Sequence, residues 1–242
     1  MSNTLYKHVI KPLLFKVKPD TVHEYMVSSG SLIQRFPGFT WIVSKFFAFK
    51  NNCLEIKKFG LVFANPVGLS AGLDKDAKLP PTMKAIGFGF VECGSVTFAQ
   101  YDGNPQPWYT RLPKSKSIIV NSGLRSEGAQ SVIARANTYK KELFTDFPLN
   151  ISVAKTNSKQ ASTCESGIED YISTLKLWEE KGNAQMYTIN ISCPNTYGGE
   201  PYTTVESLEK LLGAIDKLEI KKPVFIKMPI DKPWNEFKRL LA

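Results

Sequence analysis

The sequence predicts an α/β fold: a (β/α)8 barrel, with about the first five strand–helix units present, preceded by a helical cap. Five short apolar runs alternate with helical patterns after residue 54, whereas residues 1–50 show helical periodicity alone. A complete barrel takes about 250 residues, and about 190 follow the N-terminal helices. We therefore expect a cap over residues 1–50 and a partial barrel over residues 51–242.

The cap is predicted to contain three helices. Apolar residues recur at three- and four-residue spacing over Leu5–Val17, with lysines between them, which is typical of a basic amphipathic helix. Pro19 ends this helix, Asp20 is predicted to cap the second helix, and Phe39–Phe49 forms the third. Such helices can lie in a bilayer interface, form a hydrophobic tunnel for a lipid-like ligand, or simply pack on the main domain. Composition favours none of these alternatives.

After the cap we predict two hairpins and five strand–helix units. The hairpins span Leu54–Phe63, with a turn at Phe59-Gly60, and Tyr109–Val120. The core strands are expected at Val67–Ala71, Phe90–Thr97, Asn150–Lys155, Met186–Ser192 and Val224–Met228. The helices are expected near Pro81–Ile86, Ser126–Leu143, Gly167–Lys181, Val205–Leu218 and Pro233–Leu241.

The amino-acid composition argues against several classes of protein and of catalytic site. The 242 residues are 43% hydrophobic, which is enough to build a sizeable core. The four cysteines form no CxxC pair, which argues against a zinc site or a disulfide framework and for a reducing compartment. The two histidines, His8 and His23, both lie in the first 25 residues. We therefore expect neither a metal centre nor a Ser-His-Asp triad in the main body.

The net charge of +9 comes from 31 scattered basic residues without a Lys/Arg block or an aromatic RNA-binding motif. We therefore predict no nucleic-acid partner and attribute the charge to anionic phospholipid or an anionic substrate. The sequence has no run of 18 or more apolar residues, so no membrane-spanning segment is predicted. A signal-peptide pattern is not recognisable at the N-terminus.

The loop after the fourth predicted core strand holds the most reactive group of side chains. The hexapeptide Asn190-Ile191-Ser192-Cys193-Pro194-Asn195 places a thiol between two amide side chains. Loops at the carboxyl ends of barrel strands carry the chemistry of barrel enzymes, and a thiolate can act as a base. A lone cysteine is more often a small buried hydrophobe, so this interpretation depends on the rest of the chain.

Six segments in order along the chain carry a family resemblance: Asn65–Asp76, Gly87–Thr97, Gly103-Asn104-Pro105 with Arg111-Leu112, Asn121–Leu124, the hexapeptide, and Ile226-Lys227. They resemble, in the same order, the first strand and loop, the second strand, the following loop and hairpin, an orotate-binding loop, the catalytic loop and a flavin-contacting strand of dihydroorotate dehydrogenase. This is the FMN enzyme of pyrimidine synthesis. The resemblance covers essentially the whole chain.

The resemblance implies a flavoprotein that oxidises (S)-dihydroorotate to orotate in de novo UMP synthesis. Cys193 is expected to take the C5 proton, FMN N5 to receive the C6 hydride, and a quinone to reoxidise the flavin. Other residues receive binding roles by the same resemblance. These are Ala71, Gly72, Ser95, Ser152, Asn190 and Lys227 for the cofactor, Lys75, Asn121, Asn190 and Asn195 for the substrate, and His23 and Arg111 for the quinone.

These assignments agree with the chemistry of the ligands. A flat ring over a strand end needs small residues beneath it, which Ala71-Gly72 supplies. A lysine such as Lys227 stabilises the negative charge of a reduced flavin. Orotate combines a carboxylate with an imide-like ring edge, which Lys75 and the asparagines can bind.

The cap resembles that of the membrane-associated, quinone-dependent class of the family, with the enzyme on the cytoplasmic face of a bacterial-type cell membrane. Three departures from that class are visible. Its base is usually serine, whereas Cys193 matches the soluble classes; a thiol is nevertheless easier to deprotonate than a hydroxyl. Ser152 stands where an asparagine is expected, and the Asn121 loop is one residue short.

A fourth departure is that the family's segments after the fifth strand, including the glycine-rich turns for the FMN phosphate, are not found in the 242 residues. We therefore expect a fragment that alone binds FMN poorly and aggregates through its fifth strand. Two other readings stay open. One is a soluble-acceptor FMN oxidoreductase acting on dihydropyrimidines or dihydroorotate, and the other is an inactive barrel that only binds a membrane or a partner through residues 1–50.

Overall fold

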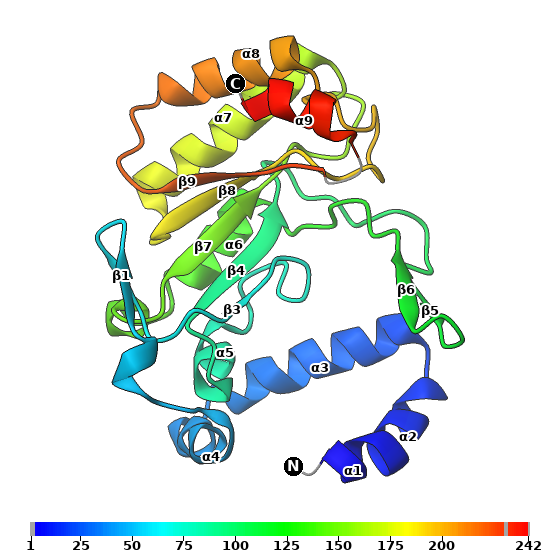
Figure 1. Cartoon of the computed structure of the whole chain (residues 1–242), viewed down its shortest axis with the longest axis vertical. Coiled ribbons are helices and arrows are strands. Elements are labelled where there is room, and N and C mark those ends of the chain that lie inside the picture. Colours follow the sequence, from blue (N-terminus) through cyan, green and yellow to red (C-terminus); the bar gives the residue numbers. More distant parts are fainter. Residues whose placement is uncertain (1–2, 230–231, 242) are drawn as a thin grey trace.

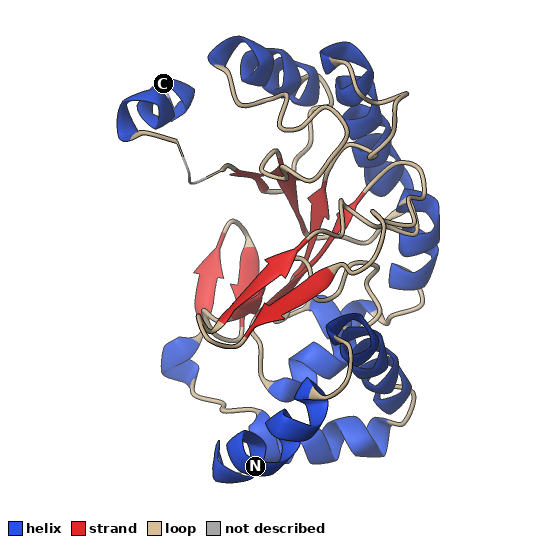
Figure 2. Ribbon diagram, turned by 90° about the vertical axis from the view of Figure 1, so that its right-hand side faces the viewer, coloured by secondary structure: helices blue, strands red, loops and turns tan. Residues whose placement is uncertain are grey.

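A computed structural model describes residues 3–229 and 232–241. Its centre is a five-stranded parallel sheet with helices along its outer side, and further helices from the N-terminal segment lie below it (Figure 1). Figure 2 shows the strands at the centre and most helices stacked to one side of them. The architecture is the α/β arrangement that the alternating sequence pattern predicts.

All five predicted core strands are present: β3 (Gly68–Leu69), β4 (Phe90–Val96), β7 (Leu149–Val153), β8 (Met186–Asn190) and β9 (Val224–Lys227). They lie in the order β3-β4-β7-β8-β9, and every neighbouring pair is parallel. Consecutive parallel strands side by side are the pattern of successive βα units in a barrel. Their carboxyl ends therefore meet at one edge of the sheet.

The helices that follow the strands are α5 (Pro80–Ile86), α6 (Ala129–Ala136), α7 (Cys164–Lys181), α8 (Val205–Asp216) and α9 (Trp234–Leu241). Threonine caps begin two of them. The Thr163 hydroxyl accepts a hydrogen bond from the Ser166 N–H at the start of α7, and Thr204 does the same for Ser207 at the start of α8. These caps satisfy backbone donors that the first helical turn leaves unpaired.

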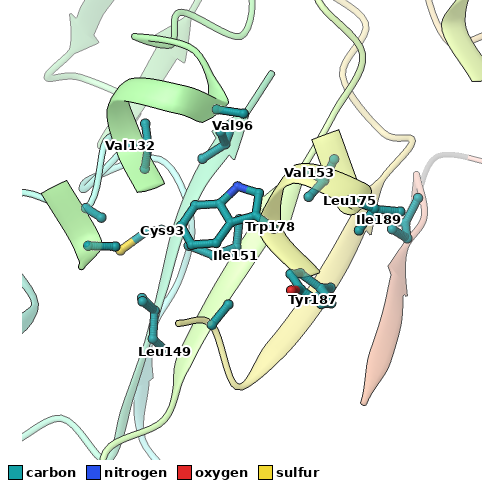
Figure 3. Packing of buried hydrophobic residues seen from close by; sticks show 14 of the residues in the cluster. Cys93, Val96, Val132, Leu149, Ile151, Val153, Leu175, Trp178, Tyr187 and Ile189 are labelled. Carbon is teal, nitrogen blue, oxygen red and sulfur yellow. The ribbon is translucent and has the colours of Figure 1, made fainter. Parts of the chain in front are cut away.

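The main core fills the space between the sheet and these helices (Figure 3). Trp178 of α7 is fully buried there and lies near Cys93 of β4 and Ile151 of β7. Alternate strand residues therefore point outward into this apolar layer. The opposite face of the strands carries polar side chains, including Asn150, Ser152, Thr188 and Asn190, which are all buried.

The N-terminal segment forms α1 (Asn3–Leu5), a π-helical turn (Tyr6–Ile10), α2 (Lys11–Phe15), α3 (Pro19–Ile33) and α4 (Pro37–Phe47). A short 3-10 turn (Asn52–Leu54) then leads to the first predicted hairpin, β1 (Ile56–Lys58) and β2 (Leu61–Phe63). The second predicted hairpin is β5 (Tyr109–Leu112) with β6 (Ser117–Val120), and Figure 1 shows it reaching down to α2 and α3.

Three predictions about helix ends are wrong. The helix predicted over Ser126–Leu143 covers only Ala129–Ala136, because Gly128 has a φ of +83° and a separate 3-10 turn forms at Lys141–Phe144. The helix α7 begins three residues before Gly167, where Thr163 caps it. Its cap pairs threonine with serine, a weaker sequence signal than the usual Glu or Gln.

The third wrong prediction is Asp20 as a helix cap. The helix α3 begins at Pro19, and no side chain caps it. The Asp20 carboxylate is buried and accepts a hydrogen bond from the Trp108 N–H at 2.8 Å. Asp20 therefore joins the cap to the second hairpin.

Within the part of the chain that the structure describes, every helix is too short or too polar to cross a bilayer.

Two glycines offer a paired test of the packing. A methyl group on Gly89 meets the Asn65 carbonyl oxygen at 1.9 Å, whereas one on Gly213, within α8, meets nothing within 4 Å. We expect Gly89→Ala to lower the free energy of unfolding by more than about 2 kcal/mol, because backbone must move. Gly213→Ala is expected to raise it by about 0.5–1 kcal/mol through helix propensity. Denaturant unfolding of both variants measures this, and a Gly89→Ala protein as stable as the parent contradicts the fold near β4.

Candidate active site

A cavity of about 330 Å³ lies at the carboxyl ends of the parallel strands, where barrels place their chemistry. Its walls are formed by the loops after β3 and β8, the ends of β4, β8 and β9, and the second hairpin with its following loop. The sequence-predicted residues that line it are Ala71, Gly72, Lys75, Ser95, Asn190, Cys193, Asn195 and Lys227. Ser152, Asn121, His23 and Arg111 are not among the lining residues, although Ser152 contacts Ser95 and His23 contacts Tyr109, which are.

Asn190 ends β8 and is held from three sides. Its amide nitrogen donates to the Ser95 hydroxyl at 2.7 Å, and its oxygen accepts from the backbone N–H and the hydroxyl of Ser192 at 3.1 and 3.0 Å. The Ser95 hydroxyl also lies 2.9 Å from that of Ser152, which is fully buried. Ser152 therefore supports the cavity through Ser95 and does not line it. The Ser192 contact also explains why β8 ends at Asn190, two residues earlier than predicted.

Cys193 lies on the cavity wall and is half-buried. Burial raises the pKa of its thiol above the ordinary range, while the Asn195 backbone N–H and the Lys75 and Lys227 ammonium groups oppose this shift. The ligand-free site therefore holds Cys193 mainly as a thiol at neutral pH. An increase in pH or a change in the surrounding charges is needed to form the thiolate.

Lys75 reaches the cavity from the loop after β3. This loop is tied to β4, because the Gly72 N–H donates to the Gly94 carbonyl and the Gly94 N–H donates to the Asp74 carbonyl. The buried Asp74 carboxylate accepts from the backbone N–H groups of Lys78 and Leu79 and fixes the far side of the loop. Lys75 Nζ donates to the Ser122 hydroxyl at 2.6 Å. Burial, and next the Arg125 charge, lowers the pKa of Lys75 to about 8.

The two other predicted asparagines lie on one side of the cavity. Asn195 lines it and donates through its amide nitrogen to the Val120 carbonyl at 2.9 Å. Asn121 is exposed, and its amide oxygen accepts from the amide nitrogen of Asn104 at 3.0 Å. Both asparagines are therefore already held by neighbouring groups.

The floor of the cavity is made of small residues. Gly72 has a φ of +116°, and a methyl group there projects into open space. Gly94 has a φ of +128°, and a methyl group there comes within 2.5 Å of the Ser152 carbonyl. With Ala71 beside them, these glycines leave a surface that a flat ring can approach closely. Lys227 at the end of β9 brings a positive charge to the same cavity.

His23 of α3 and Arg111 of β5 both lie where the cap contacts the second hairpin. The His23 ring contacts the Tyr109 ring at a centroid distance of 5.1 Å, and Tyr109 itself lines the cavity. Arg111, two residues further along β5, donates to the backbone carbonyls of Leu14 and Val17 at the end of the first cap helix. Burial and the nearby lysine and arginine charges lower the pKa of His23, so the neutral imidazole is favoured. Arg111 is engaged in holding the cap to the hairpin.

The sequence interpretation did not assign roles to four residues that shape this site. Ser122 is the partner of Lys75, Tyr109 separates the cavity from His23, and Asn104 binds both predicted asparagine segments. The buried Lys155 donates to the Tyr197 carbonyl and holds the far end of the Cys193 loop. Asn104 was visible in the Gly103-Asn104-Pro105 motif and Ser122 in the Asn121–Leu124 segment. The roles of Tyr109 and Lys155 depend on contacts between segments that are distant in the sequence.

Lys75 is expected to weaken the ligand-free fold. Below about pH 8 the folded chain carries a buried ammonium group, whereas above the ordinary pKa of 10.5 the amine is neutral in both the folded and the unfolded chain. Stability should therefore rise with pH between these values. We expect Lys75→Met to raise the free energy of unfolding at pH 7 by on the order of 3 kcal/mol, and the gain to vanish towards pH 10.5.

Urea unfolding at several pH values measures this difference. The exposed Lys176→Met is the matched control and should change stability by less than about 0.5 kcal/mol at any pH. A Lys75→Met protein that is less stable than the parent at pH 7 would show that the Ser122 contact outweighs the cost of burial.

Comparisons with known proteins agree with this geometry. The family model described as dihydroorotate dehydrogenase matches residues 53–239. A relative from Nostoc punctiforme, described as dihydroorotate dehydrogenase (quinone), is 32% identical over 98% of this chain and 64% of its own length. One from Christiangramia forsetii with the same description is 32% identical over 94% and 65%.

A solved structure of the Eimeria tenella enzyme in complex with ferulenol superposes with a TM-score of 0.74 at 25% identity, covering 92% of this chain and 62% of that one. Ligand-free enzyme from the same organism gives a TM-score of 0.73 at 26% identity. The chain thus spans about 64% of the length of the curated relatives it matches. With the family model matching more than half of its residues, the chain belongs to the dihydroorotate dehydrogenase family.

Proposed function

We propose that this protein oxidises (S)-dihydroorotate to orotate, with FMN as the bound cofactor and a quinone as the final electron acceptor. The observation that carries the proposal is the convergence of Cys193, Lys75 and the asparagines on one cavity at the strand ends. The relatives' shared description as quinone-dependent dihydroorotate dehydrogenases supports the choice of substrate and acceptor. The activity is that of pyrimidine biosynthesis.

The cavity residues fit FMN. The floor of Ala71, Gly72 and Gly94 lets a flat isoalloxazine ring approach the backbone, and Gly72 leaves open space where a side chain would otherwise project. Asn190 and Ser95 offer hydrogen-bonding groups at the edge of this floor, and Lys227 offers a positive charge. FMN, when bound there, supplies an acceptor for two electrons.

The remaining side chains suit the substrate. Dihydroorotate carries a carboxylate, and Lys75 is the more buried of the two lysines that line the cavity. An anion beside Lys75 raises its pKa again and keeps the group protonated, so substrate binding and protonation of Lys75 reinforce one another. The amide groups of Asn121, Asn190 and Asn195 can bind the polar edge of the ring.

Cys193 is the residue for proton abstraction. Oxidation to orotate removes a proton from C5 of the substrate and a hydride, which carries the two electrons, from C6. Among the side chains lining the described cavity, Cys193 is the one whose conjugate base suits the C5 proton, because the lysine Lys75 is needed for the carboxylate. Lys75 and Lys227 favour the thiolate electrostatically, against the effect of burial.

The cap is proposed to gather the quinone at a membrane surface, on the cytoplasmic face in a bacterial-type cell. Its helical segments leave large apolar side chains exposed, for example Val9 in the π-helical turn, Leu13 in α2 and Phe46 in α4. Phe46 is 79% exposed. Lysines flank these residues, as expected for a surface that meets anionic lipid. His23 and Tyr109 connect this side of the molecule to the cavity.

Substitution of Cys193 tests the base assignment in the FMN-loaded enzyme. We expect Cys193→Ala to slow flavin reduction by dihydroorotate about 10²–10⁴-fold while orotate still binds, because the thiolate acts on the proton. Cys193→Ser should retain part of the activity with a more alkaline pH optimum, since a hydroxyl is the weaker acid. The parent rate should itself increase with pH above neutrality, because burial raises the pKa of Cys193. Stopped-flow absorbance measures each rate, and unchanged reduction in Cys193→Ala refutes the assignment.

A paired substitution tests the cap without deleting it. We expect Val9→Glu with Leu13→Glu to slow flavin reoxidation by a long-chain quinone and to weaken binding to anionic vesicles, because both side chains are exposed on the first helix. Flavin reduction by dihydroorotate should stay within about twofold of the parent, since it needs only the cavity. Leu241→Glu on α9 is the control at an equally exposed site. Unaltered turnover with the long-chain quinone would favour a soluble acceptor, in keeping with the cysteine base.

A further inference from the structure

We infer that Asn104 is a positioning residue that sets which way the amide of Asn121 faces in the substrate site. The inference rests on the proposed function and identifies a residue that acts through another one. Asn104 lies in the loop between β4 and β5 and is half-buried. Its side chain contacts three other loops, which carry Asn121, Asn157 and Asn195.

The orientation of Asn157 is fixed by the backbone. Its amide oxygen accepts from the Tyr197 N–H at 2.6 Å, and its amide nitrogen donates to the Gly123 carbonyl at 2.9 Å. A backbone N–H can only donate and a carbonyl can only accept, so neither contact survives a flip of the amide. The Asn157 nitrogen, which also lies 3.3 Å from the Asn104 oxygen, must be the donor of that pair.

Asn104 is fixed in turn. Its oxygen accepts from Asn157 and from the Tyr101 hydroxyl at 2.7 Å, and its nitrogen donates to the Asn195 backbone carbonyl at 3.0 Å. A flip would place the Asn104 oxygen against the Asn195 carbonyl oxygen and its nitrogen against the Asn157 nitrogen. The orientation imposed by the backbone at Asn157 is thus passed to Asn104.

The last hydrogen bond in this series connects Asn104 to Asn121 of the proposed substrate site. The Asn104 nitrogen also donates to the Asn121 oxygen at 3.0 Å, so this oxygen is occupied from behind. The Asn121 NH2 group is then the part left to bind a ligand, and Asn121 presents hydrogen-bond donors. Asn195 is arranged in the opposite sense, because its nitrogen donates to the Val120 carbonyl and its oxygen is left to accept. Asn195 on the cavity wall thus offers an acceptor, and Asn121 beside the cavity offers a donor.

Gly123 makes the close approach of Asn104 possible. A methyl group on Gly123 comes within 2.4 Å of the Asn104 oxygen, and the glycine has a φ of +60°. The Asn104 side chain is therefore packed tightly against the loop that carries Asn121. This packing, together with its four side-chain hydrogen bonds, holds the amide in one orientation.

The proposed orientations of Asn121 and Asn195 predict which groups of the ligand each side chain binds. The donors of Asn121 suit a carbonyl or carboxylate oxygen of dihydroorotate, and the acceptor of Asn195 suits a ring N–H. Loss of Asn104 lets the Asn121 amide turn either way, so part of the protein presents the wrong group. The expected consequence is weaker orotate binding, with smaller effects on the cofactor site and on folding.

A double-mutant cycle on the FMN-bound holoenzyme tests this inference, with orotate as the probe and the flavin absorbance change as the signal. We expect Asn121→Ala to weaken orotate binding about 10- to 100-fold and Asn104→Ala about 5- to 10-fold. In the Asn121→Ala background, adding Asn104→Ala should change the dissociation constant by less than about twofold, because the residue it orients is gone. Gln100→Ala, which removes an exposed side-chain hydrogen bond to Asp102 in the same loop, is the matched control and should stay within about twofold of the parent.

Several results would overturn the inference. Additive effects of Asn104→Ala and Asn121→Ala, or an Asn104→Ala protein that binds orotate as the parent does, would assign Asn104 to packing alone. If Asn104→Ala does not fold, Asn104→Ser, which keeps a hydroxyl able to donate, enters the same cycle. Failure of both variants to fold with FMN would also make Asn104 structural. A parent holoenzyme that does not bind orotate would instead refute the proposed function.

Discussion

The hydrogen bond from the Asn190 amide to the Ser95 hydroxyl is the contact on which the geometry of the site depends. It joins the ends of β8 and β4 across β7, where Ser152 stands between them and contacts Ser95. The same Asn190 amide accepts from Ser192, ends the strand and starts the loop that carries Cys193. A larger side chain in place of Ser152 would occupy the space in which these two strand ends meet. The small side chain of Ser152 therefore allows a compact hydrogen-bonded floor.

The pKa values of the ionisable side chains in the cavity depend on burial more than on pairing with other charges. Burial lowers the pKa of Lys75 and raises that of Cys193, so the ligand-free site moves both groups towards their neutral forms. An anionic substrate reverses the shift on Lys75 but further disfavours a thiolate nearby. Lys227 and Lys75 offset that repulsion, which gives the two lysines a second role beside the ligand binding proposed for them. A serine at position 193 would need a much stronger base or field for the same proton, so the cysteine suits a cavity whose main charges are two lysines.

The sequence was sufficient to predict the sheet but not the contacts between loops. All five core strands and both hairpins were predicted, because short apolar runs and the turns between them are local signals. Helix ends were less predictable. Aspartate is a residue type that often caps helices, but the Asp20 carboxylate instead accepts a hydrogen bond from the Trp108 N–H. Gly128 adopts a positive φ that no local sequence pattern reveals. The lining of the cavity by Cys193, Lys75 and Asn190 was anticipated from motif order. The partners Ser122, Tyr109 and Asn104 were not, since each contact joins residues that are separated in the sequence and meet only in the folded chain.

The second hairpin explains how the cap and the cavity can influence one another. Tyr109 and Arg111 lie two residues apart on β5, so their side chains share one face of the hairpin. Tyr109 lines the cavity and contacts His23, whereas Arg111 binds the carbonyls of Leu14 and Val17 in the cap. The Asp20 carboxylate holds the Trp108 N–H immediately before this strand. A cap that shifts on a membrane surface must therefore move β5 or break these contacts, and any movement of β5 carries the cavity wall at Tyr109 with it. The fold thus couples the surface proposed to meet lipid with the site proposed to bind substrate, through one short strand.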